Sequence, residues 1–197
     1  MPPDTSGSPL RTINYPVVPL LHMDWTIILP VAYFLVLGFL LWLIWPIFIG
    51  AIFLPTPPDV VEKMLSVADV GEGDILYDLG SGDGRIIIGA AERGARGVGV
   101  EADPIRVLWS RLRAHRSPAH DRLRVIWGDF FKTSFAEASV VTVYQGESIN
   151  NRLREKLEAE LKPGSRVVSF SFKFEGWEPA KKHPDADVYL YLIPVKA

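Results

Sequence analysis

The stretch "LYDLGSGDGRI", residues 76–86, places three glycines within five positions, two residues after Asp78. Glycine inside regular structure costs stability, so such a cluster marks an unusual backbone path or the close approach of another group. Residues 74–80 read as a short strand, and "GRIIIGAAERG", residues 84–94, reads as a helix. A glycine-rich turn between a strand and a helix presents backbone N–H groups to a ligand.

The alternation of strand and helix continues on both sides of this stretch. The patterns predict further strands over 97–103, 123–129, 138–145, 165–174 and 186–196. They predict further helices over 56–65, 104–116 and 150–164. Such alternation implies right-handed crossovers and an α/β fold with a mostly parallel, doubly wound (Rossmann-like) sheet. In such sheets the ligand lies at the carboxyl ends of the strands, where the strand order reverses.

Three acidic residues at expected strand ends suggest which ligand binds there. A pyrophosphate favours the spacing Gly-x-Gly-x-x-Gly, but this chain has Gly-x-Gly-x-Gly with Asp78 just ahead of it, an arrangement that suits an ammonium group instead. Glu101 ends the next strand and can accept both hydroxyls of a ribose. Asp129, in "WGDFF", can accept a hydrogen bond from an exocyclic amine. S-adenosylmethionine carries all three groups.

The apolar residues are concentrated near the N-terminus. The chain has 197 residues, a net charge of −2 and no cysteine, which excludes disulfides and thiolate metal sites; we predict no metal site. No charged residue stands between Asp24 and Asp59, a run longer than the roughly 20 apolar residues that cross a bilayer. The run is therefore interpreted as a transmembrane helix, and a buried core helix and a cleaved signal peptide are the alternatives to that interpretation. The expected domains are a disordered arm (1–23), a transmembrane helix with a juxtamembrane segment (24–54), and a globular domain (55–197).

The globular part resembles the class I S-adenosylmethionine-dependent methyltransferases. "DLGSGDGR" is similar to their first motif, "VEAD" to their ribose-binding segment and "GDFF" to their adenine-side segment. Each motif alone has a simpler reading, as a tight turn, a solvated strand end or a turn aspartate. Together, in order on successive strands, they imply a methyltransferase domain over 55–197 that holds the cofactor through Asp78, Gly80, Ser81, Gly82, Gly84, Glu101, Ala102, Asp129 and Phe130.

A narrower resemblance concerns the small protein lysine methyltransferases, which include archaeal enzymes and the mitochondrial enzymes acting on the c-subunit of ATP synthase and on the adenine nucleotide translocase. It rests on "FLPTPPDVVEKML" (53–65), on "LREKLEAELKPGSRVVSFSF" (153–172) and on the late "GW". The chain departs from that family where a Ser-His-Asp-Phe run is usual, since it has "SFSF" at 169–172, and it has "EGW" in place of Pro-Gly-Trp. The cofactor assignment therefore transfers better than the substrate assignment.

The acceptor side is expected after the fourth strand. Tyr144, Gln145 and Glu147 follow that strand, and Glu147 can attract a lysine ammonium and accept its proton, or it can cap the next helix. Ser169 and Ser171 share one face of the fifth strand, because side chains two apart point the same way, and they are expected on the substrate side. Trp177 either forms a wall for the lysine stem or belongs to the core.

A basic segment, residues 106–124, is the remaining feature of the globular part. It holds six arginines and two histidines against one aspartate. Nucleic-acid binding is not predicted, because no aromatic stacking platform accompanies the charges and the net charge is slightly negative. In a tethered protein the segment is expected to contact anionic lipid, and a solvated basic helix is the simpler alternative. The arginines proposed for lipid contact are Arg106, Arg111, Arg113 and Arg116.

These features predict a single-pass, membrane-anchored protein lysine N-methyltransferase with S-adenosylmethionine as cofactor and a protein, itself membrane-associated, as substrate. The catalytic domain is expected on the cytosolic or mitochondrial matrix side, where the cofactor is available. Two alternatives stay open: a methyltransferase that acts on a membrane lipid or quinone-like molecule, and a scaffold that binds the cofactor without catalysis.

Overall fold

The computed structural model describes residues 24–48 and 54–194, which fall into two compact units divided near residue 45. The described part of the first unit is most of the helix α1 (Trp25–Phe48). Its window Trp25–Trp42 is long and apolar enough to cross a membrane by length and composition, and none of that window is buried. The arm expected to be disordered, residues 1–23, lies outside the described residues.

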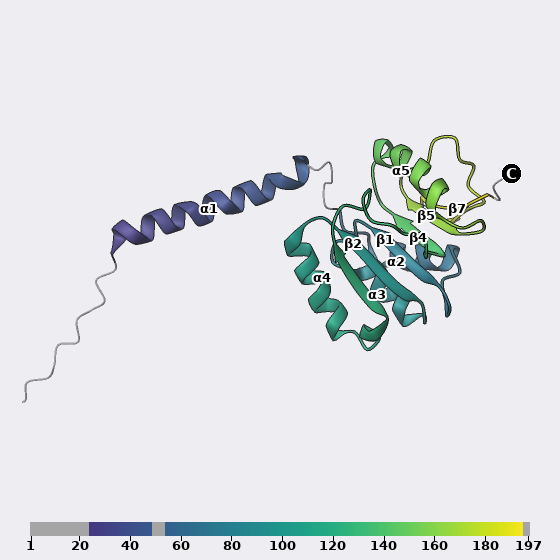
Figure 1. Cartoon of the computed structure of the whole chain (residues 1–197), viewed down its shortest axis with the longest axis horizontal. Coiled ribbons are helices and arrows are strands. Elements are labelled where there is room, and N and C mark those ends of the chain that lie inside the picture. Colours follow the sequence, from purple (N-terminus) through teal and green to yellow (C-terminus); the bar gives the residue numbers. More distant parts are fainter. Residues whose placement is uncertain (1–23, 49–53, 195–197) are drawn as a thin grey trace, which may run out of the picture. The chain divides into compact units, whose positions relative to one another are not determined.

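The second unit is built on one seven-stranded sheet with the strand order β3-β2-β1-β4-β5-β7-β6 (Figure 1). Neighbouring strands pair in parallel from β3 through β5, whereas β7 pairs antiparallel with both β5 and β6. The mostly parallel α/β sheet expected from the sequence is therefore confirmed. The strands are β1 (Ile75–Leu79), β2 (Arg96–Glu101), β3 (Leu123–Trp127), β4 (Val140–Val143), β5 (Arg166–Phe170), β6 (Lys181–Lys182) and β7 (Val188–Leu192).

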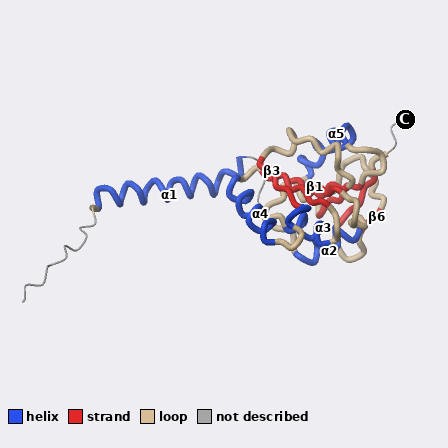
Figure 2. Tube along the Cα trace, turned by 60° about the horizontal axis from the view of Figure 1, so that its bottom comes forward, coloured by secondary structure: helices blue, strands red, loops and turns tan. Residues whose placement is uncertain are grey.

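Helices cover both faces of this sheet, which gives two hydrophobic cores (Figure 2). The first core joins the sheet to α2 (Pro58–Val67), α3 (Arg85–Glu92) and α4 (Pro104–Arg116). The second joins the opposite face to α5 (Glu147–Glu160), through buried residues such as Leu153 and Leu157. Successive strand residues alternate between the cores, as Leu76 and Tyr77 do, because strand side chains point to opposite faces.

The strand order reverses between β1 and β4, which are neighbours in space although β2 and β3 lie between them in sequence. The loops that follow β1, β2 and β4 therefore converge at one edge of the sheet. This is the position where ligands bind in doubly wound sheets.

The last part of the chain differs from the sequence expectation. The strand expected over 165–174 ends at Phe170, and Ser171 has a φ of 63°. The amide of Phe172 donates a 2.8 Å hydrogen bond to the carbonyl of Phe170, so the chain turns there instead of continuing extended. The short strand β6 was not expected, because its two residues show no alternation of polar and apolar side chains.

Candidate active site

A pocket of about 360 Å³ lies at the carboxyl ends of β1, β2 and β4. Its walls come from the segment before α2, from the glycine loop, from the turns after β2, β3 and β4, and from the start of α5. Eleven of the twenty residues that line it carry a polar or charged side chain, and the others are apolar residues or glycines. They are Leu54, Pro55, Thr56, Asp78, Gly80, Ser81, Gly82, Asp83, Arg85, Ile86, Glu101, Ala102, Arg106, Asp129, Phe130, Phe131, Tyr144, Gln145, Ile149 and Arg152.

The glycine loop takes a backbone path that explains its composition. Gly80, Gly82 and Gly84 have φ values of 85°, 53° and 79°, a region that side chains other than glycine rarely adopt. A Cβ atom on Gly80 would stand 2.4 Å from the amide nitrogen of Gln145. The loop is held to β2, because the amides of Gly80 and Ser81 donate to the carbonyl of Val100 at 2.8 and 3.1 Å. Gly84 then starts α3 as its N-terminal cap residue.

Asp78 is a buried carboxylate that faces the pocket, and no cationic side chain pairs with it among the described residues. The hydroxyl of Thr142 on β4 donates to its Oδ1 at 2.8 Å. Burial above all, together with the negative charges of Glu101 and Asp83, raises the pKa of Asp78 to about 7, although the Thr142 hydrogen bond acts to lower it. An ammonium group placed beside this carboxylate would compensate its desolvation, as expected for the amino-acid end of S-adenosylmethionine.

Glu101 ends β2 as a second buried carboxylate. Its Oε2 accepts from the amide of Gly82 at 2.8 Å, and its Oε1 accepts from the amide of Asp103 at 2.9 Å. Because an ionised carboxylate has about four acceptor positions, each oxygen can accept one more hydrogen bond, as a ribose diol requires. The sequence did not reveal this second task, in which Glu101 joins the glycine loop to the start of α4.

The third acidic residue, Asp129, is exposed at the pocket wall. Its Oδ1 accepts from the amide of Phe131 at 2.8 Å, which fixes the turn after β3. The neighbouring rings of Phe130 and Phe131 lie 4.8 Å apart and both line the pocket, so they offer an apolar wall beside this carboxylate. Ala102 and Ser81 line the pocket as expected.

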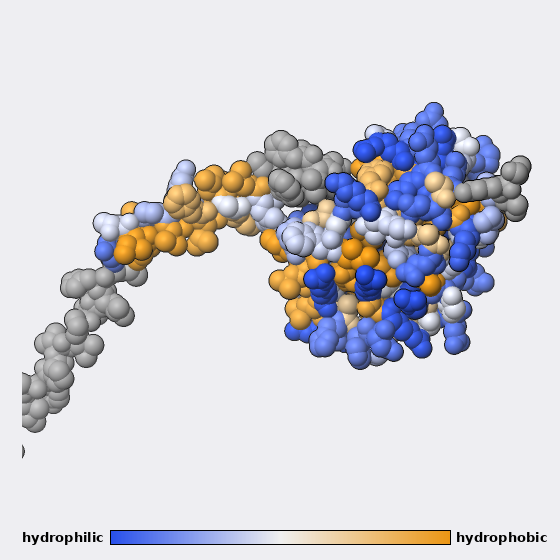
Figure 3. Space-filling view, viewed as in Figure 1, coloured by the Kyte–Doolittle hydropathy of each residue, from blue (hydrophilic) through white to orange (hydrophobic). Residues whose placement is uncertain are grey.

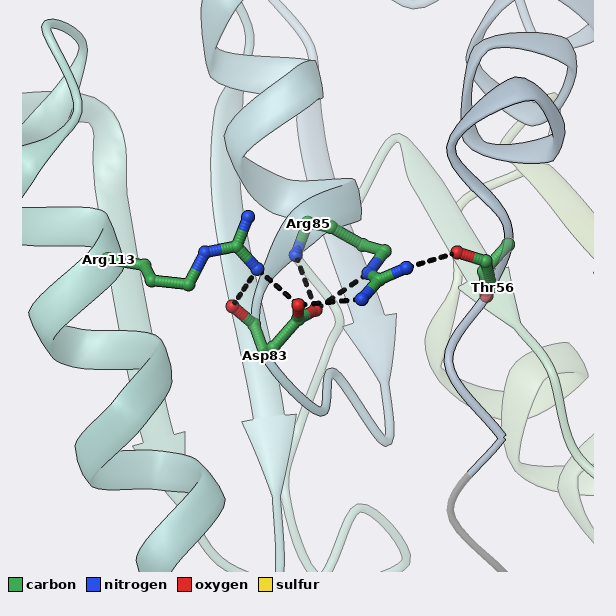
Figure 4. A network of polar contacts seen from close by, with 4 residues as sticks. All are labelled: Thr56, Asp83, Arg85 and Arg113. Atoms are coloured by element: carbon green, nitrogen blue, oxygen red, sulfur yellow. Dashed lines mark hydrogen bonds and ion pairs between the residues drawn. The ribbon is translucent and has the colours of Figure 1, made fainter.

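A charged network fastens the glycine loop to its neighbours (Figure 4). Two nitrogens of Arg85 donate to the carboxylate of Asp83 at 2.9 and 2.8 Å, and a third donates to the carbonyl of Thr56 at 2.7 Å. Arg113 on α4 also pairs with Asp83. Partial burial alone would raise the pKa of Asp83, but the Arg85 hydrogen bond and both guanidinium charges lower it on balance. Asp83 thus stays ionised and joins three segments around the pocket.

On the acceptor side, the structure brings two of the three expected residues into the pocket. Tyr144 and Gln145 line it, and Gln145 donates to the carbonyl of Leu79 at 3.1 Å. Glu147 does not line it; the residue is exposed at the first position of α5. It makes no capping bond either, since the cap position belongs to Gly146 and carries no side-chain hydrogen bond. Its negative charge instead lies in the first turn of α5, where its interaction with the helix dipole stabilises the helix.

Ser169 and Ser171 do not share one face of a strand as expected, because β5 ends at Phe170 between them, and neither serine lines the pocket. Ser169 is buried toward α5, where it donates to the carbonyl of Phe172 at 2.5 Å and accepts from Asn150 at 3.3 Å. Ser171 lies in the turn beyond the strand. The aromatic ring of Phe170 instead lies on the acceptor side, 4.6 Å from the ring of Tyr144, and Phe172 follows at 6.4 Å.

Trp177 belongs to the second core and does not line the pocket. Its ring packs 4.9 Å from Phe174 and 5.6 Å from Tyr191, and its indole N–H donates to Glu158 at 2.7 Å. Of the two interpretations of Trp177, the core interpretation agrees with these contacts.

The arginines expected to contact lipid differ in their surroundings. Arg106 lines the pocket. Arg111 donates to the carbonyl of Val125 at 3.1 Å, and Arg113 pairs with Asp83. Arg116 is exposed at the end of α4. Some arginines of the basic segment therefore make contacts within the folded unit.

Several pocket residues were not expected in the site from the sequence. Arg106 lies in the first turn of α4 and Arg152 in the second turn of α5, positions from which a long side chain reaches the site, but a solvated helix arginine has the same sequence pattern. Thr142 lies inside β4, so only the pairing of β4 with β1 reveals its contact with Asp78. Among the described residues, no group of three His, Cys, Asp or Glu could hold a metal ion.

Known proteins with similar sequences are methyltransferases. A family model described as the ANTKMT methyltransferase domain matches residues 78–181. A protein-lysine N-methyltransferase of Saccharolobus islandicus is 42% identical over 149 residues, which cover 72% of this chain and 92% of the relative. The lysine N-methyltransferase of Mus musculus that is named for the C-subunit of ATP synthase is 38% identical over 127 residues, 64% of this chain but only 51% of the relative.

A solved structure adds a bound ligand to the comparison. A protein of Salinibacter ruber, described as an RNA methyltransferase in complex with S-adenosyl-L-homocysteine, is 44% identical with a TM-score of 0.70; the match covers 73% of this chain and 96% of that one. The C-terminal domain of a precorrin-6Y methyltransferase from Rhodobacter capsulatus shares the fold at 16% identity and a TM-score of 0.56.

Proposed function

Because the chain belongs to the ANTKMT methyltransferase family of S-adenosylmethionine-dependent methyltransferases, we propose that it is a membrane-anchored protein-lysine N-methyltransferase. The observation that carries the proposal is the pocket in which Asp78, Glu101 and Asp129 meet at neighbouring strand ends. The name of the Saccharolobus islandicus relative, 92% of which is covered by the match, supports lysine as the acceptor.

Each acidic residue has a role that suits one end of the cofactor. The Asp78 carboxylate would hold the ammonium group, the free acceptor positions of Glu101 would take the ribose hydroxyls, and Asp129 beside Phe130 would take the adenine. The positive φ values at Gly80 and Gly82 leave the loop backbone bare for close approach. When bound, S-adenosylmethionine supplies an electrophilic methyl group.

We assign the acceptor side to Tyr144 and Gln145, beside the rings of Phe170 and Phe172. A lysine must lose its proton before it reacts, which costs about 4–5 kcal/mol at pH 7 from an ordinary pKa of about 10.4. Partial desolvation and the positive charge of Arg152, which lines the pocket, lower the lysine pKa and reduce that cost. Exposed Glu147 attracts the lysine cation from outside.

The proposal places α1 across a membrane and the catalytic unit on the cytosolic or matrix side. α1 has 24 residues, enough for the hydrocarbon core of a bilayer at 1.5 Å per residue. Residues 1–24 ahead of it carry Arg11 against Asp4 and Asp24, whereas every other lysine and arginine of the chain follows it. The proposed domains are the arm (1–23), the anchor (24–54) and the methyltransferase domain (55–197).

Three other acceptors or roles compete with protein lysine. A lipid headgroup or quinone-like molecule would suit a membrane-anchored enzyme, and the description of the Salinibacter ruber protein as an RNA methyltransferase favours RNA as a second candidate. A scaffold without catalysis would bind the cofactor but transfer nothing.

One experiment separates these possibilities. The purified full chain, in detergent or nanodiscs, is incubated with S-adenosylmethionine labelled in its methyl group. Membranes and RNA from cells of the organism that encodes the chain are added as acceptors. We expect the label in protein, recovered as methyl-lysine after acid hydrolysis, and no transfer by an Asp78→Asn variant. Label confined to lipid or to RNA would overturn the lysine assignment, and cofactor binding without any transfer would establish the scaffold.

A further inference from the structure

The outer face of α4 is apolar, which is the reverse of an ordinary surface helix. The side chains of Ile105, Leu108, Trp109 and Leu112 are exposed, and that of Leu108 is 71% accessible. The inward positions Val107, Ser110 and Ala114 are small and buried. The exposed residues follow the spacing i, i+3, i+4, i+7, so they form one continuous stripe along the helix. Figure 3 shows hydrophobic residues gathered over α4.

A second tryptophan extends this stripe onto the edge of the sheet. Trp127, the last residue of β3, is 64% exposed, and its indole N–H donates to the carbonyl of Ala102 at 3.0 Å. Ala102 lies just before α4, so the ring of Trp127 is held beside the start of the helix. Arg111 also joins the two elements through the carbonyl of Val125. We call the five residues Ile105, Leu108, Trp109, Leu112 and Trp127 the apolar face.

The charged side chains of α4 itself have one sign. α4 carries four arginines and one histidine and no carboxylate. Asp103, which caps the helix, is fully buried. Two exposed tryptophans, exposed aliphatic side chains and flanking arginines are the composition of a helix that lies in the headgroup region of a bilayer. A cationic rim complements anionic lipid.

The chain also limits how far this surface can stand from the anchor. Residues 49–53 are all that separate Phe48, the end of α1, from Leu54, a residue of the pocket wall. Even fully extended at about 3.6 Å per residue, this connection reaches only about 20 Å. If α1 crosses a bilayer, the pocket wall lies within that distance of its surface, and lipid is the apolar phase available to the nearby face.

From these observations we propose that the apolar face of α4 and Trp127 docks on the membrane surface, with the aliphatic and indole groups among the lipid headgroups. Arg106, next to Ile105, lines the pocket, so docking places the pocket mouth at the interface. The docking surface rests on the proposed membrane anchor and lysine methyltransferase function, and it would hold the pocket mouth toward lysines that lie at the bilayer surface.

The chain contains no cysteine, so a single introduced cysteine can carry a spin label without other changes. The full chain is reconstituted into vesicles of phosphatidylcholine with phosphatidylglycerol, with the label at Leu108→Cys or Leu112→Cys. Glu155→Cys, on the exposed side of α5 against the opposite sheet face, is the matched control. Collisions with oxygen, which concentrates in lipid, and with a water-soluble nickel chelate report the surroundings of each label.

We expect labels at 108 and 112 to collide with oxygen at least several-fold more often, relative to the chelate, than the label at 155. Equal chelate access at 108 and 155 would overturn the docking proposal. Protection from the chelate with strong spin–spin broadening would also overturn it, because a second copy would then cover the face. Each labelled variant must bind S-adenosylmethionine like the parent, and this readout separates failed docking from a failed cofactor assignment.

Discussion

The hydroxyl of Thr142 on β4 lies 2.8 Å from Oδ1 of Asp78 on β1, and this is the side-chain hydrogen bond that the buried carboxylate receives. One neutral donor does not offset complete burial beside two negative charges, so the pKa of Asp78 rises to about 7. The protein without cofactor therefore holds a proton at Asp78 below pH 7. A cationic ligand must displace that proton to gain the full ion pair.

Cofactor binding should therefore release a proton in mildly acidic solution. At pH 6, calorimetry in buffers of different ionisation enthalpy should show close to one proton released per S-adenosylmethionine bound, and at pH 8 close to none. Affinity should fall by up to about tenfold per pH unit below pH 7. Asp78→Asn, which keeps an acceptor for Thr142, should bind weakly and lose this proton release. Binding by the parent protein without proton release at pH 6 would refute the assignment.

The same carboxyl should make stability depend on pH. Its folded-state pKa is raised above the unfolded value of 3.8, so the folded chain binds the proton more tightly. This contribution to stability is present at low pH and is lost as pH rises from about 4 to about 7. Thermal unfolding of Asp78→Asn without cofactor should lack that loss. If parent and variant have parallel pH profiles across the window, Asp78 titrates normally.

Replacement of Glu101 should damage both the ribose site and the loop. Glu101→Ala removes acceptors for the amides of Gly82 and Asp103 as well as for the ribose, and each unmatched group costs about 1–3 kcal/mol. We expect affinity for S-adenosylmethionine to fall by roughly 5–150-fold. Glu101→Gln keeps one acceptor oxygen and should lie between. Unchanged affinity of Glu101→Ala in calorimetry would contradict the ribose role.

Two glycines with nearly the same φ test the glycine loop. Gly80 has a φ of 85° and Gly164 a φ of 83°, but a Cβ atom meets Gln145 only at Gly80, since nothing lies within 4 Å at Gly164. Each alanine variant should lose roughly 1–2 kcal/mol of stability to backbone strain. Only Gly80→Ala should also lose cofactor affinity. Equal binding by both variants would show that the loop tolerates a side chain.

Substitutions of Tyr144 and Glu147 test which of these residues acts on the bound lysine. Because Tyr144 lines the pocket and Glu147 does not, Tyr144→Phe should lower kcat about tenfold or more. Glu147→Gln should leave kcat within about twofold and raise KM for the lysine substrate. Cofactor affinity of both variants is the control. A large loss of kcat in Glu147→Gln alone would instead support its role as the proton acceptor.

Arg152 provides a test through the pH profile. Its guanidinium lies 4.3 Å from the ring centre of Phe131 and lines the pocket, so it lowers the pKa of an incoming lysine. The rate should rise by up to about tenfold per pH unit below the lysine pKa, and Arg152→Gln should shift the profile to higher pH. A vertical drop without a shift would mean that Arg152 only supports the pocket wall.

The convergence of Asp78, the glycine loop, Glu101 and Asp129 on one pocket could be predicted from the sequence because it depends on local patterns. Asp78 and the glycines lie within one strand-loop-helix unit, Glu101 ends β2, and Asp129 follows the end of β3 by two residues. The parallel sheet follows from the same alternation. These features depend on neighbours in the chain, so a single sequence contains them.

The acceptor half depends on where strands end and which elements meet. The alternation of "SFSF" predicts an extended chain, but the turn at Ser171 depends on tertiary contacts such as its 2.8 Å hydrogen bond to the carbonyl of Asp187. The position of Glu147 outside the pocket likewise depends on the direction in which α5 leaves β4. The pairing of Asp83 with Arg113, 30 residues away, is also invisible in the sequence.

The 2.7 Å hydrogen bond from Arg85 to the carbonyl of Thr56 determines where the polypeptide can be cut. A protease acting within residues 49–53 would release a fragment that keeps Leu54, Pro55 and the Thr56 contact, and therefore the whole wall of the pocket. Cleavage a few residues later would open that wall. If the proposed anchor and substrate class are right, the first cut would leave the chemistry intact and abolish the high local concentration of membrane substrates that tethering would provide.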